Sequence, residues 1–123
     1  MLKDCTLIEP LYCQETESVM DVAKKLREHV IRHIFIVDTS KKPVGVISIT
    51  DMNNRVVAEG KDAKTLKAHD IMTKPVVAFE ETSDEKTAYE SCVKQKVATC
   101  PVTRQGQIIG MVTIHELLRK IAG

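Results

Sequence analysis

Two stretches of this sequence repeat one pattern, which limits the chain to folds built from a duplicated unit. Residues 32–37 (RHIFIV) resemble residues 98–103 (ATCPVT), and residues 45–51 (GVISITD) resemble residues 110–116 (GMVTIHE). One residue is lost in the turn between the two stretches of the second copy, and turns tolerate deletions best. A unit half as long as this chain has too little interior to be stable alone. The sequence therefore predicts two copies that share a core.

Each copy has the pattern of strand, helix, strand, turn, strand and helix. In the first copy, Ser18 offers a helix cap before apolar residues that recur at helical spacing from Val19 to Val30. Asp51 is suited to begin a short helix that runs toward Gly60. The predicted strands are residues 10–14, 34–37 and 44–49, the last two forming an antiparallel hairpin around the turn 38–43.

The second copy repeats this order. Asp84 is expected to cap a helix that ends near Gln95, and a last helix runs through Ile121. The predicted strands are residues 76–79, 100–103 and 108–113. We therefore predict an α+β fold of two pseudo-twofold-related β-α-β-β-α repeats. Residues 1–60 form the first repeat, 61–67 a polar linker and 68–123 the second repeat, and the two repeats make one folded module.

Composition excludes several classes of function. The 123 residues include 18 Lys and Arg against 17 Asp and Glu, a net charge of +1, so general nucleic-acid binding is not expected. No apolar run reaches the roughly 20 residues that a membrane-spanning helix needs, and the first residues lack the apolar stretch of a secretory signal. We expect a cytoplasmic protein that does not associate with membranes.

The four cysteines do not form a metal-binding pattern. Cys5, Cys13, Cys92 and Cys100 lack the spacing of two to four residues that is usual in structural zinc sites, so no metal site is predicted. Cys5 and Cys13 are as far apart in sequence as Cys92 and Cys100, but each pair is divided between different elements and is expected to point in different directions. Buried, unreactive thiols are the main interpretation, and redox or metal sensing is an alternative.

One motif occurs at the same corner of both copies: a hydroxyl residue three positions before an acidic residue. These are Ser48 with Asp51 and Thr113 with Glu116, each where a strand ends and a helix begins. Free backbone N–H groups, a hydroxyl and a carboxylate converge there, a combination that can hold phosphate and sugar hydroxyls. Helix capping alone is the alternative explanation.

The two corners, with residues 70–75 (DIMTKP) and Pro101-Val102, resemble a tandem cystathionine β-synthase (CBS) domain pair, or Bateman module. The resemblance covers the chain from about Asp4 to Ile121. It implies a standalone regulatory module without catalytic residues or a required cofactor. Such modules bind adenosine compounds in clefts between the repeats, and the acid of one repeat accepts hydrogen bonds from ribose hydroxyls.

The resemblance assigns two sets of ligand-binding residues. The favoured site comprises Ile47, Ser48, Thr50, Asp51, Met72, Thr73, Lys74, Pro75, Val76, Thr99, Cys100 and Pro101. The second site comprises Thr6, Leu7, Ile8, Pro10, Arg32, His33, Ile34, Val112, Thr113, His115 and Glu116.

The second site departs from the family pattern. Glu116 replaces the usual Asp, and its extra methylene pushes the carboxylate outward and adds a bond to be fixed on binding. Residues 5–9 also lack the Met-Thr-Lys-Pro run found at 72–75. We therefore favour the Asp51 site, with Lys74 as the cation for a phosphate and Arg55 or Arg32 as alternatives.

Enzymatic interpretations find little support in the sequence. Ser48, Asp51 and His115 are the residue types of a hydrolase triad, but they lie on two separate corners without a nucleophile elbow. His29 and His33 have the spacing of a helical metal pair, but no further ligand completes a set. Neither a Gly-rich dinucleotide loop nor a phosphate-binding loop ending in Lys-Ser or Lys-Thr is present.

The leading hypothesis is a regulatory adenine-nucleotide or energy sensor that acts on an enzyme or transporter. AMP is the first candidate ligand, followed by ADP, ATP and S-adenosylmethionine. The resemblance also implies a homodimer formed through the helices. The alternative is a ligand-independent dimerisation or scaffold module in which the two corners only cap helices.

Overall fold

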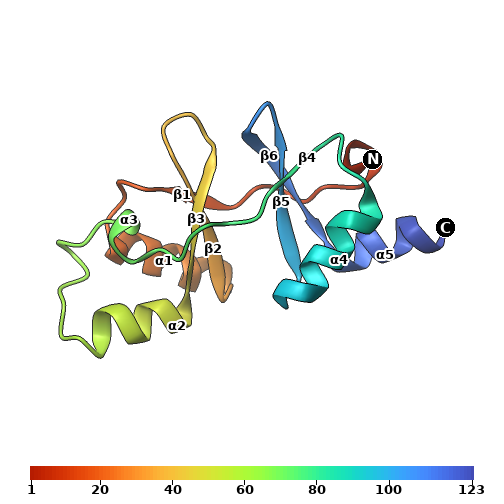
Figure 1. Ribbon diagram of the computed structural model, residues 1–123. Helices are drawn as coiled ribbons and strands as arrows, with labels where there is room; N and C mark the ends of the chain where they lie inside the picture. Colours follow the sequence, from red (N-terminus) through yellow and green to blue (C-terminus); the bar gives the residue numbers. More distant parts are fainter. The chain divides into compact units, whose positions relative to one another are not determined.

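The chain forms two compact units, each with one three-stranded sheet and its own helices (Figure 1). A computed structural model describes all residues from 1 to 123. Unit 1 consists of Met1–Pro10 and Val77–Gly123, and unit 2 of Leu11–Val76. Each unit therefore combines most of one repeat with the segment that leads into the other repeat. The predicted α+β class and the repeated order of elements are confirmed.

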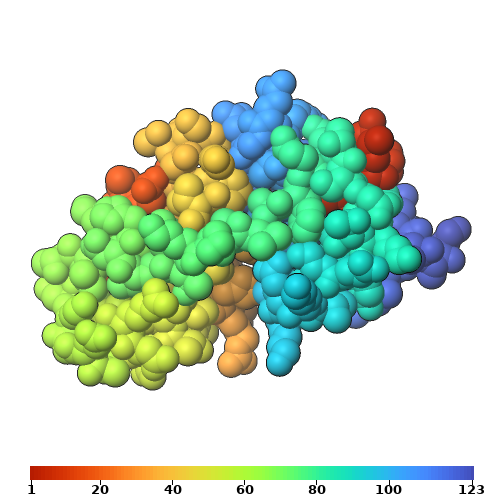
Figure 2. Space-filling view, in the orientation of Figure 1, coloured from red at the N-terminus to blue at the C-terminus, as the bar shows by residue number.

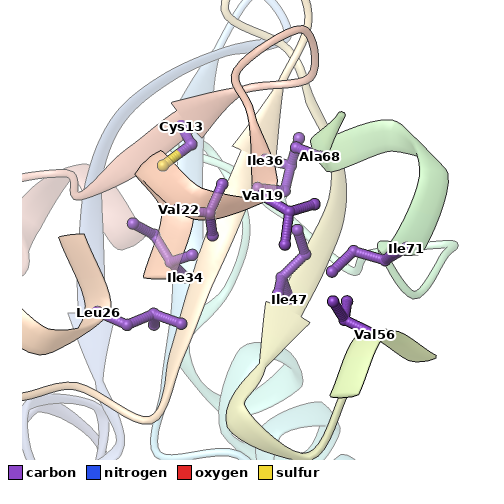
Figure 3. Close-up of a cluster of buried hydrophobic side chains, with 10 residues drawn as sticks. All are labelled: Cys13, Val19, Val22, Leu26, Ile34, Ile36, Ile47, Val56, Ala68 and Ile71. Carbon is purple, nitrogen blue, oxygen red and sulfur yellow. The ribbon is translucent and has the colours of Figure 1, made fainter. Parts of the chain in front are cut away.

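Unit 2 contains the first sheet, in the order β1-β2-β3. Strand β1 (Tyr12–Gln14) runs parallel to β2 (His33–Val37), and β2 pairs antiparallel with β3 (Pro43–Ser48). Helix α1 (Val19–His29) connects β1 to β2. Figure 3 shows the core that packs between this helix and the sheet: Cys13, Val19, Val22, Leu26, Ile34, Ile36, Ile47, Val56, Ala68 and Ile71.

Unit 1 repeats this arrangement in the order β4-β5-β6. Its strands are β4 (Phe79–Glu80), β5 (Thr99–Arg104) and β6 (Gln107–Thr113), and its helices are η1 (Leu2–Asp4), α4 (Glu85–Gln95) and α5 (Ile114–Ala122). The core of unit 1 comprises Leu2, Cys5, Ala88, Cys92, Cys100, Val102, Val112 and Leu117. No helix in either unit has both the length and the apolar character needed to cross a bilayer.

The two long helices begin where their caps predict. The Ser18 hydroxyl accepts the Asp21 N–H at 3.1 Å, and the Asp84 carboxylate accepts the Thr87 N–H at 3.1 Å. These bonds satisfy N–H groups that have no partner within the helix. The predictions for both N-termini are confirmed.

The end of α1 differs from the prediction. We expected Val30 to continue the apolar face, but the helix ends at His29 and Val30 is 89% exposed. Val30 is the C-cap, in the left-handed conformation with a φ of 53°. A β-branched side chain is strained there, and a left-handed residue stops the helix. The turn that follows α1 forms an orange projection in the space-filling view (Figure 2).

The prediction that a helix begins at Asp51 is wrong. Helix α2 (Ile49–Met52) begins earlier, with Ser48 as its N-cap and Asp51 as its third residue. The chain continues directly into a π-helix, η2 (Asn53–Val57). Strand β3 therefore passes into the helix at Ser48, and Ile49 is helical rather than the end of the strand.

Residues 61–67 are attached to unit 2 by backbone hydrogen bonds. The N–H of Val19 donates to the Leu66 carbonyl at 2.9 Å, and the N–H of Met20 donates to the Ala63 carbonyl at 3.0 Å. A short helix, α3 (Ala68–Ile71), follows and buries Ala68 and Ile71. A single helical turn is too short to show the periodicity of apolar residues from which a helix is predicted.

We expect Val30→Gly to stabilise unit 2 by about 1 kcal/mol, because glycine adopts a left-handed C-cap without strain. Because the Val30 side chain is exposed, replacing it with glycine removes no packing contact in the core. Thermal unfolding should show a rise of roughly 3 to 5 °C in Tm. Lys96→Gly is the matched control: Lys96 caps α4 with a φ of 59° but is not β-branched, so its gain should be smaller. An unchanged or lower Tm for Val30→Gly would contradict this explanation.

Candidate functional site

The corner between β3 and α2 is held by a reciprocal pair of hydrogen bonds. The Ser48 hydroxyl accepts the Asp51 N–H at 3.0 Å, and Oδ2 of Asp51 accepts the Ser48 N–H at 2.9 Å. This is a capping box, so the capping role that we considered as the alternative is real. It occupies only one of the two carboxylate oxygens of Asp51.

The other oxygen, Oδ1, faces a second segment of unit 2. It accepts the Thr73 hydroxyl at 3.2 Å, and Nε of Arg55 lies 3.7 Å away. The Asp51 side chain is 14% exposed, so its carboxylate is largely shielded from water by these neighbours. Because the hydroxyl is a neutral donor and the arginine contact is long, Oδ1 keeps capacity to accept a further hydrogen bond.

A glycine allows the Thr73 segment to lie against β3. Thr73 and Val46 exchange two backbone hydrogen bonds, of 2.8 and 3.0 Å. Beside this bridge, a Cβ on Gly45 would come within 2.5 Å of Sδ of Met72. The glycine of the repeated motif is therefore needed for close packing of the entering segment.

Arg55 holds the same segment from its other side. Its Nη1 donates to the carbonyls of Ile71 at 2.9 Å and Met72 at 3.2 Å. We had considered Arg55 as a phosphate cation, whereas the structure uses it to fix the backbone next to Thr73. Lys74 is exposed and has no hydrogen bond or ion pair within the protein, so it remains the available cation.

The structure brings together part of the favoured site. Ile47, Ser48, Thr50 and Asp51 lie at the end of β3 and the start of α2, next to Met72 and Thr73. Lys74, Pro75 and Val76 continue that segment in unit 2. Thr99, Cys100 and Pro101 lie on β5 of unit 1, and their place in the site stays a prediction.

The second corner, in unit 1, starts from the same cap but uses its acid differently. The Thr113 hydroxyl accepts the Glu116 N–H at 3.1 Å. The Glu116 carboxylate reaches beyond its own backbone: Oε2 accepts the Thr6 N–H at 2.6 Å. Arg119 binds both oxygens, through Nε at 2.7 Å and Nη2 at 2.9 Å. The extra methylene of Glu116 therefore places the charge in a bidentate ion pair.

The remaining residues of the second predicted site are divided between the units. Leu7 and Ile8 lie beside β6, where Ile8 pairs with Met111 and a Cβ on Gly110 would come within 2.9 Å of the Leu7 Cβ. Thr6, Pro10, Val112, Thr113, His115 and Glu116 also belong to unit 1, whereas Arg32, His33 and Ile34 belong to unit 2. Partial burial lowers the pKa of His33, whose ring stands edge-on to Phe35.

Comparison with known proteins gives the family. A model of the CBS domain matches residues 2–58 and, a second time, residues 68–123. The chain belongs to the CBS domain family. The two matched ranges correspond to the two copies that the repeat predicts.

Relatives of this CBS pair include a protein of Methanopyrus kandleri, 33% identical over 105 residues, and the mitochondrial CBS domain-containing protein CBSX3 of Arabidopsis thaliana, 24% identical over 115 residues. These alignments cover 85% and 90% of this chain. The chain spans only about half of each relative, 54% and 56% of their lengths.

Two solved structures show the same fold. The CBS domain pair of the protein MJ0100, in complex with 5′-methylthioadenosine and S-adenosyl-L-methionine, is 28% identical with a TM-score of 0.72, over 100% of this chain and 96% of that one. Hypoxic Response Protein I, with two coordinated zinc ions, is 19% identical with a TM-score of 0.80, over 96% of both chains. At that identity the second structure supports the fold alone.

All four cysteines of this CBS pair are free and buried. The prediction that Cys92 and Cys100 point in different directions is wrong: although Cys92 lies on α4 and Cys100 on β5, both side chains enter the core of unit 1. Burial raises the pKa of every one of these thiols, that of Cys13 to about 11. Thiols that stay protonated at neutral pH are poor nucleophiles and metal ligands, which supports the interpretation as unreactive core residues.

The Glu116 carboxylate predicts a specific dependence of stability on pH. The hydrogen bonds from Arg119 and then from Thr6 lower its pKa from an ordinary 4.5 to about 2. A carboxylate with a lowered folded-state pKa stabilises the fold above its unfolded pKa and loses that contribution as the pH falls. We therefore expect Glu116→Gln to flatten the fall in urea midpoint between about pH 5 and pH 2.5. Glu90 is an exposed residue of the same unit without an ion pair, so the urea midpoint of Glu90→Gln should depend on pH as that of the native chain does. If the midpoints of the native chain and both variants fall in parallel with pH, this role of Glu116 is contradicted.

Proposed function

We propose that this CBS pair is a non-catalytic regulatory module that binds an adenosine-containing ligand at the Asp51 corner. The observation that carries the proposal is the second carboxylate oxygen of Asp51, which serves no capping role and faces the Thr73 segment. A ribose hydroxyl is a neutral donor like the Thr73 hydroxyl and can take its place without leaving a charge unpaired. The complex of the MJ0100 pair with two adenosyl compounds supports the same ligand class.

The residues around Asp51 suit the other parts of such a ligand. Met72 and Val76 are partly exposed and offer apolar surface for an adenine ring, and Lys74 is a free cation for a phosphate. The side chain of Ile47, predicted as part of the site, is fully buried in the core of unit 2 and is not available to a ligand. Thr99, Cys100 and Pro101 remain proposed contacts to the same ligand. AMP is the first candidate, and ADP, ATP and S-adenosylmethionine follow.

The Glu116 corner is the weaker candidate for a second molecule. A ligand hydroxyl there would compete with two hydrogen bonds from Arg119, which are charge-assisted and bidentate. We therefore propose one adenosyl ligand per chain, held at Asp51.

Ligand binding would regulate a partner by changing the balance between two conformations. The free energy available equals the difference in ligand affinity between them. The regulated enzyme or transporter is not identified by any residue of this chain. The alternative, a scaffold without a ligand, is favoured by one observation: the capping box accounts for Ser48 and one oxygen of Asp51.

We expect an adenosyl ligand at 100 times its Kd to stabilise the native chain by about 2.7 kcal/mol, seen as a rise in Tm. The thermal-shift panel is AMP, ADP, ATP, NADH, 5′-methylthioadenosine and S-adenosylmethionine. Asp51→Ala should weaken binding roughly ten- to hundredfold, because it removes a charged acceptor of hydroxyl hydrogen bonds. Glu116→Gln is the matched change at the other corner and should leave the shift intact.

A further variant separates ligand types within that experiment. Lys74→Gln should weaken AMP but leave 5′-methylthioadenosine unaffected, because only AMP carries a phosphate. If no compound raises the Tm of the native chain, the scaffold alternative is favoured. A shift that Glu116→Gln abolishes and Asp51→Ala does not would place the site at the other corner.

We also propose that the module is a homodimer in solution. Helix α5 has an exposed apolar stripe in Leu118 and Ile121, which are 42% and 43% exposed, and Val93 of α4 is half exposed. Covering such a stripe with a second copy removes apolar surface from water. Size-exclusion chromatography with light scattering should give a dimer for the native chain and a weaker dimer for Leu118→Glu. A native monomer at micromolar concentration would contradict this proposal.

A further inference from the structure

Unit 2 has a hollow of about 590 Å³ that the adenosyl site does not explain. After η2 the chain runs outward as a loop and returns to α3 (Figure 1). The residues that line the hollow come from η2, this loop and α3. Its lining residues are Arg55, Glu59, Lys61, Leu66, Asp70 and Ile71. The volume is within the range of about 300 to 1,000 Å³ that is typical of small-molecule sites.

The walls of the hollow are fixed by backbone hydrogen bonds. The N–H of Lys61 donates to the Val56 carbonyl at 3.0 Å, which folds the loop back on η2. Gly60 makes this turn with a φ of 66°, in the region that favours glycine. The Leu66 carbonyl accepts the Val19 N–H, which joins the opposite wall to α1. The hollow is therefore present before any ligand binds.

Two positive and two negative side chains surround the hollow. Nη1 of Arg55 is held by two backbone carbonyls, while its Nη2 has no acceptor within the protein. Lys61 and Glu59 make only a loose pair with each other, at 3.6 Å. Asp70 caps α3 by accepting the Lys67 N–H at 2.8 Å through Oδ2, and its Oδ1 lies 3.2 Å from Nδ1 of His69, with which an ammonium would compete. These charges cancel in sum, and none of the four is in a close ion pair with another.

Two apolar residues, Leu66 and Ile71, also line the mainly polar hollow. Leu66 is half-buried and packs against the core of unit 2, to which Ile71 belongs. Separate cations and anions beside the half-buried Leu66 match a small molecule that carries a carboxylate, an ammonium and an apolar side chain. A ligand with several phosphates fits poorly, because two carboxylates on the rim repel it.

We propose that this hollow binds a free amino acid with an apolar side chain. Its carboxylate pairs with Arg55 and Lys61, its ammonium pairs with Glu59 and Asp70, and its side chain contacts Leu66. The proposal does not depend on the adenosyl proposal, although the hollow shares Arg55 with the Asp51 corner, where Nε of Arg55 lies 3.7 Å from Oδ1 of Asp51. The hollow is open to solvent and its charges are exposed, so binding is weak and in fast exchange.

The test is amide chemical-shift mapping by NMR on the intact chain, with each standard L-amino acid as the probe. We expect an apolar amino acid such as L-leucine to shift the amides of Lys61, Leu66 and Ile71. L-leucinamide and N-acetyl-L-leucine each lack one of the two charges and should both bind more weakly than L-leucine. No change at these amides with any amino acid would overturn the proposal.

Variants on the exposed loop distinguish a built site from general charge effects. Lys61→Gln and Glu59→Gln should each weaken the binding about two- to fivefold, as expected for an exposed ion pair. Lys64→Gln is the matched control, because Lys64 is an exposed lysine of the same loop that does not line the hollow. Equal effects of Lys61→Gln and Lys64→Gln would overturn the site. Neither loop residue contacts Asp51, so AMP binding is measured independently in the same variants.

Discussion

The close approach of an extended segment to a glycine in the last strand of each sheet is the contact on which both corners depend. In unit 2, Met72 packs over Gly45 and Thr73 bridges to Val46; in unit 1, Leu7 packs over Gly110 and Ile8 bridges to Met111. A Cβ at Gly110 would come within 2.9 Å of the Leu7 Cβ and 3.2 Å of the Ile8 carbonyl oxygen, which would push the segment away from the strand. A Cβ at Gly45 would meet the side chain of Met72, which would have to move. The acid in the first turn of the helix that follows the strand then contacts that segment, Asp51 through the Thr73 hydroxyl and Glu116 through the Thr6 N–H. The repeated glycine and the repeated acid therefore act together: the glycine lets the segment approach the strand, and the acid binds it.

The hydrogen bonds of the two acids differ because Glu116 is one methylene longer than Asp51. Asp51 is short enough to reach back to the Ser48 N–H, so one oxygen caps the helix and the other faces Thr73. Glu116 accepts no hydrogen bond from the N–H of its N-cap residue, and its carboxylate instead binds the Thr6 N–H and the guanidinium of Arg119. The first corner keeps a carboxylate oxygen that only neutral or distant donors contact. At the second corner, both oxygens and the charge are satisfied within unit 1.

The sequence predicted the parts of the fold that short-range chemistry determines. Ser18 and Asp84 marked helix starts because their side chains accept N–H groups three residues later, and the apolar runs predicted both hairpins. The start of α2 was misplaced because Asp51 was taken for the cap, whereas it is the third residue of a capping box that Ser48 begins. Single-turn helices such as α3 lack a periodic signal. The contact of Thr73 with Asp51 joins distant residues and followed only from family resemblance, whereas the Glu116–Arg119 spacing was visible in the sequence and overlooked.

The difference between the corners determines how a ligand can act on this CBS pair. Binding changes a conformational equilibrium only through contacts that differ between the two states. In the proposed binding mode at Asp51, a ribose hydroxyl would replace a neutral hydroxyl contact, so little of the binding energy would be consumed in breaking existing bonds. At Glu116 a ligand has to displace a bidentate arginine and also release the N-terminal segment held through Thr6. Under the proposed function, the same adenosyl group would therefore retain more of its binding energy at Asp51 than at Glu116.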